Sequence, residues 1–408
     1  MHQTSRFFGW SVAWAAFVLA VFAWGIGFYG PSVFLQVLHA RHGWSISAIS
    51  SAITVHFLCS AGIIFFLPEI HRRYGVFRTT VIGVLFTAAG IVAWASAASL
   101  WHLFPAAVLS AVGWAVTSGA AINAIVAPWF NRERPKAISL AFNGASVGGM
   151  LFAPLWVYLI AGLGFQSAAA TVGAVAIAVL VPLSYRYFRL GPSDVGTNPD
   201  GAIQAVSSPK PKAALSKRSL LSDKRFITLS APFALALFAQ IGLFSHLIAR
   251  LAPVTGQSVA AVAVTLTTLC AVLGRTVLAR FMGERDRRVV AAANFALQAV
   301  GVLLLALADH TAPLLIGCVL FGLGVGNLTS MPPLIAQKTF APADVGTVVA
   351  LLTSVNQAVF ALAPAAIGLV RDATSSYAVP FVIAAAVQVV AALIVVYGRR
   401  HDQSFTAA

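Results

Sequence analysis

The sequence has few charged residues. Only 9% of its 408 residues are Asp, Glu, Lys or Arg, and just 11 of them are acidic, whereas soluble globular proteins have about 25% charged residues. Hydrophobic residues make up 59% of the chain. This composition excludes a soluble fold. A helix needs about 20 apolar residues to cross a hydrocarbon core of about 30 Å, and the chain has room for twelve such helices.

The sequence also lacks the groupings that carry chemistry. Its three cysteines, Cys59, Cys270 and Cys318, lie inside apolar runs and have no second ligand at metal spacing, so we interpret them as packing residues. No Ser/His/Asp set, paired carboxylates or nucleotide motif occurs in the apolar runs, which argues against an enzyme, a cofactor or ATP-driven transport. The net charge of +15 is spread over short gaps without a basic face, so we expect no nucleic-acid partner.

Apolar runs bounded by charge, Pro and Gly predict the positions of the membrane-spanning helices. The first six are expected at roughly 10–38, 45–68, 79–98, 101–128, 136–163 and 168–188. The second six are expected at roughly 226–249, 258–281, 289–307, 312–335, 345–370 and 377–397. The fold class is therefore all-α and integral to the membrane.

One long polar gap divides the chain. Residues 189–225 are rich in Pro, Gly, Ser and Lys, which is typical of a flexible linker. We therefore predict a six-helix bundle over 1–188, a cytoplasmic linker over 189–225, a second six-helix bundle over 226–397 and a cytoplasmic tail over 398–408.

The location of Lys and Arg predicts the orientation, because these residues accumulate on cytoplasmic loops. With both termini in the cytoplasm, 22 of the 26 basic residues are cytoplasmic. Arg41, Arg250 and Arg371 are then expected on the outer side, and Arg275 is the only basic residue placed inside a predicted span. We expect a multi-pass protein of the plasma membrane that acts as a monomer.

The two halves resemble each other. The segment "HGWSISAISSA" (42–52) before the second helix resembles "TGQSVAAVAVT" (255–265) before the eighth, and an Arg-rich loop follows each of these helices. Corresponding positions of this kind are the signature of a transporter built from two parallel, pseudo-symmetric six-helix repeats.

The whole chain resembles the major facilitator superfamily. Within it, "PWFNRERPKAISLAFNGASVGG" (128–149), "FFGW" (7–10), "GFYGPSVF" (27–34), "NQAVFALAPAAIG" (356–368) and the Gly274-Arg275 dipeptide are similar to the monocarboxylate transporter and oxalate:formate antiporter branch. The resemblance implies alternating access around a central cavity that is lined by the first helix of each half.

The same resemblance implies a gating or packing role for the loop after the second helix, where Arg73 and Gly75 match the family pattern. The loop departs from that pattern because Arg72 stands at the usual Asp position and Pro68 at the leading Gly position. The animal branch often has a Lys in the first helix and an Asp one turn before the Arg of the eighth. Here the first helix has no Lys, and the latter position is Ala271.

Arg275 is the strongest candidate for binding substrate. A charged side chain within a span is costly, so it usually faces a cavity or a partner. A guanidinium in a cavity can bind a carboxylate through two parallel hydrogen bonds. The alternative is that Arg275 extends to the cytoplasmic surface, about 9 Å away at 1.5 Å per residue.

Two histidines are candidates for proton coupling, because the sequence places no carboxylate inside a span. His56 lies near the middle of the second helix and His246 near the outer end of the seventh. The alternative for His56 is a neutral histidine bonded to a neighbouring helix, and for His246 a packing role at the membrane interface.

Polar side chains within other spans are candidates for the surroundings of a small anion. An amide in such a helix can equally bond to a neighbouring helix. The candidates are Tyr29, Asn123, Asn143, Gln240, Asn327, Asn356 and Gln357.

Small residues predict close helix packing in the fifth span. Gly144, Gly148 and Gly149 let this helix approach a neighbour, and Pro154 is expected to interrupt it. In the tenth span, Gly322, Gly324 and Gly326 before Pro332 and Pro333 predict a similar weak point.

The function that fits these observations is secondary transport of a small organic anion, with a monocarboxylate as the favoured substrate and protons as a candidate coupling ion. The alternative is an exporter of larger or uncharged compounds, in which Arg275 has a structural or gating role.

Overall fold

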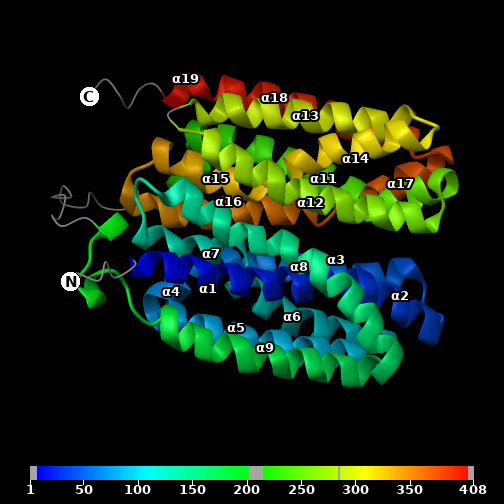
Figure 1. The fold of residues 1–408 in the computed structure, drawn as a ribbon, viewed down its shortest axis with the longest axis horizontal. Coiled ribbons are helices and arrows are strands. Elements are labelled where there is room, and N and C mark those ends of the chain that lie inside the picture. Colours follow the sequence, from blue (N-terminus) through cyan, green and yellow to red (C-terminus); the bar gives the residue numbers. More distant parts are fainter. Residues whose placement is uncertain (1–6, 202–214, 284, 403–408) are drawn as a thin grey trace, which may run out of the picture. The chain divides into compact units, whose positions relative to one another are not determined.

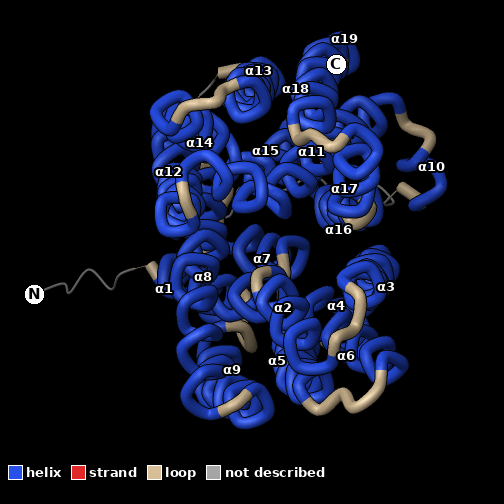
Figure 2. Tube along the Cα trace, turned by 90° about the vertical axis from the view of Figure 1, so that its right-hand side faces the viewer, coloured by secondary structure: helices blue, strands red, loops and turns tan. Residues whose placement is uncertain are grey.

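A computed structural model describes residues 7–201, 215–283 and 285–402. The middle of the predicted linker and the end of the predicted tail lie outside these residues. The chain divides into two compact units, Met1–Lys212 (unit 1) and Ala213–Ala408 (unit 2). The described residues form helices and no strands (Figures 1 and 2).

Unit 1 contains the first six spans. Its α-helices are α1 (Phe8–Ala23), α2 (Gly30–His42), α3 (Ile46–Phe65), α4 (Leu67–Tyr74), α5 (Val76–Ala95), α6 (Leu103–Thr117), α7 (Gly119–Val126), α8 (Arg134–Leu163) and α9 (Phe165–Tyr187). Short helices complete it: the π-helical turn η1 (Trp24–Phe28) and the 3-10 turns η2 (Leu100–His102), η3 (Ala127–Trp129), η4 (Ser193–Val195) and η5 (Pro199–Gly201).

Unit 2 contains the remaining six spans. Its helices are α10 (Lys217–Leu221), α11 (Lys224–Thr255), α12 (Gln257–Phe281), α13 (Arg287–Leu307), α14 (Thr311–Val325), α15 (Asn327–Thr339), α16 (Pro342–Phe360), α17 (Ala363–Thr374), α18 (Ala378–Tyr397) and α19 (Arg399–Asp402).

Twelve helical segments of the described chain are long and apolar enough to cross a membrane. Four predicted spans are interrupted rather than continuous. The first contains the π-helical turn η1, the fourth breaks at Ser118, the tenth at Gly326 and the eleventh at Ala361–Leu362. The interruption at Gly326 coincides with the weak point that the glycines of this span predict.

Single glycines make two of the sharpest connections. Gly164 joins α8 to α9 with φ of 77°, and Gly256 joins α11 to α12 with φ of 81°. Residues with a Cβ rarely adopt this backbone, so glycine allows each helix to reverse direction within one residue. In unit 1, α1 packs on α8 and α5 lies between α6 and α9. In unit 2, α13 packs along α18, as Figure 1 shows, and also against α14.

One prediction about the helices is wrong. The fifth span is not interrupted at Pro154, because α8 continues through it to Leu163. A broken helix in lipid would leave several backbone groups without water, so the helix loses only the bond that proline cannot donate.

The seventh span is longer than predicted, because α11 extends beyond residue 249 to Thr255 and so includes Arg250. Its guanidinium donates to the carbonyl oxygens of Leu305 (2.9 Å) and Ala308 (2.6 Å). These carbonyls end α13, where a cation is favourable because the last carbonyls of a helix have no partner within it.

Candidate functional site

Arg275 is buried within α12, with 3% of its surface exposed. Its Nε donates to the carbonyl oxygen of Gly326 at 2.7 Å, and Nη2 lies 3.5 Å from Oγ1 of Thr329. The side chain is therefore enclosed by the protein. The guanidinium lies beside the interruption of the tenth span.

The interruption between α14 and α15 gathers several polar groups. The Gly326 carbonyl also accepts the hydroxyls of Thr329 (3.2 Å) and Ser330 (3.4 Å). Nδ2 of Asn327 donates to Oδ1 of Asn294 at 2.8 Å, and Nδ2 of Asn294 donates to the Gly324 carbonyl at 3.2 Å. A break in a membrane helix frees backbone carbonyls, and these side chains satisfy them.

Unit 2 also contains three buried amides that are not among the residues predicted from the sequence. These are Asn294 and Gln298 of α13 and Gln388 of α18. Nε2 of Gln388 donates to Oε1 of Gln298 at 3.1 Å. The detectable signal was the spacing of Asn294 and Gln298, because two amides four residues apart share one face of an otherwise apolar helix.

The remaining candidates of unit 2 lie on other helices. Gln240 of α11 and Asn356 and Gln357 of α16 are buried, and these two helices pack against each other. Oε1 of Gln240 and Oδ1 of Asn356 are buried without a hydrogen-bond partner among the described residues. Buried polar atoms of this kind are costly, so they mark places where a water or ligand could bind.

The candidates of unit 1 are distributed over three spans. Tyr29 follows the π-helical turn of the first span, Asn123 is buried in α7, and Asn143 is half-buried in α8. Oδ1 of Asn123 has no partner among the described residues. The ring of Tyr29 lies against Gly149 of α8.

Glycines of α8 bring this helix against the first span. A Cβ at Gly144 would lie 2.1 Å from the Phe17 carbonyl oxygen, and one at Gly148 would lie 2.4 Å from that of Val21. A Cβ at Gly149 would lie 2.5 Å from Cζ of Tyr29. Any larger residue would force α1 and α8 apart.

His56 is enclosed by unit 1. Its side chain is 1% exposed, and Nδ1 lies 2.8 Å from Oγ of Ser110, which also accepts Nε1 of Trp94 at 3.1 Å. The Ser110 hydroxyl donates to the Ala107 carbonyl at 3.0 Å, so Nδ1 carries the proton. Nε2 is buried and makes no hydrogen bond to a described residue, although the backbone of Gly27 lies beside the ring.

His246 belongs to α11 in the seventh span. Its ring lies beside the interruption of the eleventh span. Nε2 is 3.0 Å from the Pro364 carbonyl oxygen and Nδ1 is 3.3 Å from the hydroxyl of Tyr377. A carbonyl only accepts, so Nε2 carries the proton and Nδ1 accepts from Tyr377. His246 thus donates a hydrogen bond to the carbonyl oxygen of Pro364, which lies in the first turn of α17 after the interruption.

The basic segment after the second span is the short helix α4, which ends at Gly75 with φ of 77°. Arg73 is exposed, and its guanidinium carbon lies 5.4 Å from the centre of the Tyr74 ring. The contact that the structure shows for the Arg73 side chain is therefore with the aromatic ring of Tyr74.

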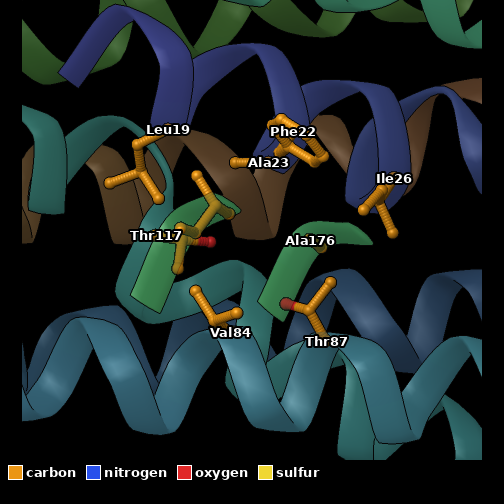
Figure 3. Close-up of a pocket in the computed structure, with 9 residues that line it drawn as sticks. Leu19, Phe22, Ala23, Ile26, Val84, Thr87, Thr117 and Ala176 are labelled. Atoms are coloured by element: carbon orange, nitrogen blue, oxygen red, sulfur yellow. The ribbon is translucent and has the colours of Figure 1, made fainter. Parts of the chain in front are cut away.

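Figure 3 shows a small pocket of unit 1 lined by residues of α1, η1, α5, α6 and α9, with a cavity volume of about 10 Å³, which is roughly the space of one water molecule. Its lining is apolar except for Thr87 and Thr117, and the Thr117 hydroxyl donates to the Gly113 carbonyl at 2.7 Å. With no charged side chain in the lining, this pocket is unsuited to an anion. No group of three or more metal-ligating side chains occurs in the described part of the chain.

Comparisons with known proteins agree with this architecture. A model of the Major Facilitator Superfamily matches residues 12–364 and 251–406. The human organic anion transporter MFSD10 (TETRAN) has a similar structure, with a TM-score of 0.69 over 96% of this chain and 100% of that one, at 15% sequence identity. That likeness shows the major facilitator fold.

Similar sequences include transporters from several organisms. Monocarboxylate transporter 11 of Mus musculus is 28% identical over 45% of this chain and 42% of its own length. The uncharacterised MFS-type transporter YcxA of Bacillus subtilis is 27% identical over 44% of each chain. The MFS transporter asaE of Aspergillus flavus is 29% identical over 70% of this chain and 64% of its own length.

The chain thus spans less than half the length of the first two of these relatives, but the family model extends across nearly all of it. Together with twelve helices long and apolar enough to cross a membrane, this match assigns the fold and the membrane location. The protein belongs to the Major Facilitator Superfamily.

Proposed function

We propose that this protein is a secondary transporter of a small organic anion, with a monocarboxylate as substrate, and that it works by alternating access in the plasma membrane with both termini in the cytoplasm. The observation that carries the proposal is Arg275, a guanidinium buried in an apolar helix. Insertion of such a charge costs about 2.5–3.5 kcal/mol, so its retention indicates a use. A single guanidinium suits one carboxylate.

The relatives support the same substrate class. One similar sequence is named a monocarboxylate transporter, and the structural neighbour is described as an organic anion transporter. Both are distant, so the argument depends on the residues of this chain. The bond to Gly326 holds the guanidinium inside the protein, where a carboxylate in a water-poor cavity would bind it more strongly than in water.

The test is uptake of labelled lactate, pyruvate, formate and oxalate into liposomes that contain the purified protein. We expect saturable uptake of at least one of them. Arg275→Lys should lose most of this transport, because an ammonium cannot make two parallel hydrogen bonds to a carboxylate. Full transport by Arg275→Lys at unchanged apparent affinity would contradict the role of Arg275.

Arg275→Ala serves as the second variant. It should remain folded, because the Gly326 carbonyl keeps the hydroxyls of Thr329 and Ser330 as donors. Its melting temperature in detergent should therefore stay close to that of the original protein, while carboxylate uptake is lost. This combination separates loss of binding from loss of structure.

The bond from Arg275 to Gly326 also favours a second candidate function, in which the guanidinium only stabilises the interrupted helix. The protein would then export larger or uncharged compounds. In that case no carboxylate of the panel is taken up, and Arg275→Ala lowers the melting temperature. The two candidates thus predict opposite results for the same pair of measurements.

Proton coupling through His56 is part of the proposal. Nε2 is the ring atom that would take up a proton, because Nδ1 is engaged with Ser110. His56→Gln keeps hydrogen bonding but cannot gain charge near pH 6–7, where an unperturbed histidine titrates at about 6.5. The variant should still exchange substrate yet lose accumulation under an imposed pH gradient.

Normal accumulation by His56→Gln would assign His56 a structural role. His246→Gln is then the next variant, since His246 is only half-buried. The matched control is His39→Gln, because His39 is exposed and its ring lies 2.7 Å from the nearby Trp44 carbonyl oxygen.

A further inference from the structure

The eighth and tenth spans approach each other unusually closely beside Arg275. A Cβ at Gly274 would lie 1.9 Å from the Leu323 carbonyl oxygen, and one at Gly326 would lie 2.4 Å from that of Ala271. Both distances are far below a normal contact, so α12 and the α14–α15 segment meet backbone to backbone. A small movement of one segment must therefore move the other.

The guanidinium of Arg275 lies directly over this contact. A Cβ at Gly326 would lie 3.0 Å from both Cζ and Nη2 of Arg275. Together with the 2.7 Å bond from Nε to the Gly326 carbonyl, this places the interrupted backbone against the guanidinium. A planar group attached at one end and hydrogen-bonded at Nε has a fixed plane.

The interruption itself is held by Asn294 of the neighbouring helix α13. Its amide oxygen accepts from Asn327, the first residue of α15, and its amide nitrogen donates to Gly324, near the end of α14. Asn294 therefore connects the two segments on either side of Gly326. Its side chain is buried, with 6% exposed, so the bonds form away from solvent.

We infer that Asn294 is a positioning residue for the substrate: by bridging Gly324 and Asn327 it holds the Gly326 carbonyl in place, and that carbonyl sets the direction in which Arg275 presents its guanidinium to a carboxylate. This inference rests on the proposed function and extends it to a residue that need not touch the substrate. Two-point recognition of a carboxylate depends on the plane of the guanidinium. A rotation of that plane weakens binding without removing the charge.

The experiment compares Asn294→Leu with Ser330→Ala in the liposome assay, using the carboxylate of the panel that is taken up. Asn294→Leu has similar volume and removes both bridging bonds. We expect the half-saturating concentration to rise about tenfold, the usual scale for losing a buried hydrogen bond, with the maximal exchange rate changed less than about twofold.

Ser330→Ala is the matched control, because it removes a donor to the same Gly326 carbonyl and leaves the bridge intact. It should leave the half-saturating concentration unchanged. If Asn294→Leu cannot be purified in a folded state, Asn294→Ser, which is too short to bridge the two segments, replaces it.

The double variant of Arg275 and Asn294 distinguishes a positioning role of Asn294 from a purely structural effect. In an Arg275→Lys background, which lacks the Nε donor, Asn294→Leu should cause no further loss of affinity, because both changes act on the same interaction. An unchanged half-saturating concentration for Asn294→Leu alone overturns the inference. So does a full tenfold loss that persists in the Arg275→Lys background.

The proposed function fails in a different way. If no carboxylate is taken up, or if Arg275→Lys and Arg275→Ala leave affinity unchanged, Arg275 does not bind substrate, and the inference fails with it. If both Arg275 variants lose affinity while Asn294→Leu does not, the proposed function stands and only the positioning role is wrong.

Discussion

The interruption in the first span of unit 1 and the interruption in the tenth span of unit 2 have different surroundings. The π-helical turn η1 is enclosed by rings: the centre of the Trp114 ring lies 5.0 Å from that of Trp24 and 6.1 Å from that of Phe28. The interruption at Gly326 is enclosed by a guanidinium, amides and hydroxyls.

The difference indicates separate tasks for the two units. Aromatic rings fill space and exclude water, which stabilises a fixed shape. Hydrogen-bonded amides can exchange partners for a substrate at low cost, since the polar groups stay satisfied. Unit 2 therefore brings a guanidinium, amides and hydroxyls together at an interrupted helix, whereas His56 of unit 1 lies beside the Phe57 ring, with 4.8 Å between the ring centres.

The largest effect on stability is expected for Trp114→Ala. Trp114 is buried in unit 1 and contacts Trp24, Phe28 and Phe57. Its truncation should lower the free energy of unfolding by about 3–5 kcal/mol, measured by denaturant unfolding in detergent. The control is Trp101→Ala, whose side chain is 78% exposed and which should change little. Equal losses in the two variants would contradict the aromatic support of η1.

A smaller effect is expected for the amides of unit 2. Gln298→Leu should cost about 1–3 kcal/mol, because it leaves the buried amide of Gln388 with only its longer bond, to the Ala236 carbonyl at 3.4 Å. The double variant Gln298→Leu, Gln388→Leu should be more stable than the single one, since no buried amide is then stranded. Denaturant unfolding in detergent measures the stabilities of the single and double variants and so tests which is higher. A double variant less stable than the single one would show that these residues stabilise by packing rather than by their bond.

The comparison extends to aspartates of the linker that accept backbone N–H groups near the start of a helix. In unit 1, Oδ2 of Asp200 accepts the backbone N–H groups of Asn131 (3.1 Å) and Arg132 (2.7 Å) just before α8. Asp200→Asn keeps one acceptor and tolerates the backbone φ of 60° at this position, so it isolates the charge. We expect a loss of about 0.5 kcal/mol.

The matched control is Asp194→Asn, because the Asp194 carboxylate accepts the nearby Gly191 N–H within the same segment. Thermal unfolding of both variants measures the difference. A loss for Asp194→Asn as large as that for Asp200→Asn would mean that the contact between the linker and α8 contributes nothing specific.

The smallest effect is a pH dependence in unit 2. Burial raises the pKa of Asp223, but the hydrogen bonds and the charge of Arg225 outweigh it, so the pKa lies below the usual 3.8. Stability from this pair is therefore present above pH 3.8 and is lost as the pH falls through the lowered pKa. Melting temperatures of the original protein and of Asp223→Asn should converge in that acidic range. Parallel curves would contradict the contribution of Asp223.

The sequence by itself determined the membrane fold. Long apolar runs must become helices in lipid, where no water is present to satisfy the backbone, so the number of spans and most of their ends follow from hydropathy. The same physics identified Arg275, because a charge in an apolar run is conspicuous. Pro154 was misjudged, because the cost of breaking a helix in lipid exceeds the cost of one lost bond.

Only the tertiary structure decided which groups face one another. Asn294 is separated from Asn327 by 33 positions, and Arg275 from Gly326 by 51. The periodicity of the sequence cannot predict such contacts. They depend on which helices pack together and on the rotation of each helix about its axis. The sequence places no carboxylate inside a predicted span that could pair with the guanidinium of Arg275. Its partner is a backbone carbonyl, which every residue carries and which becomes available only where the helix is interrupted.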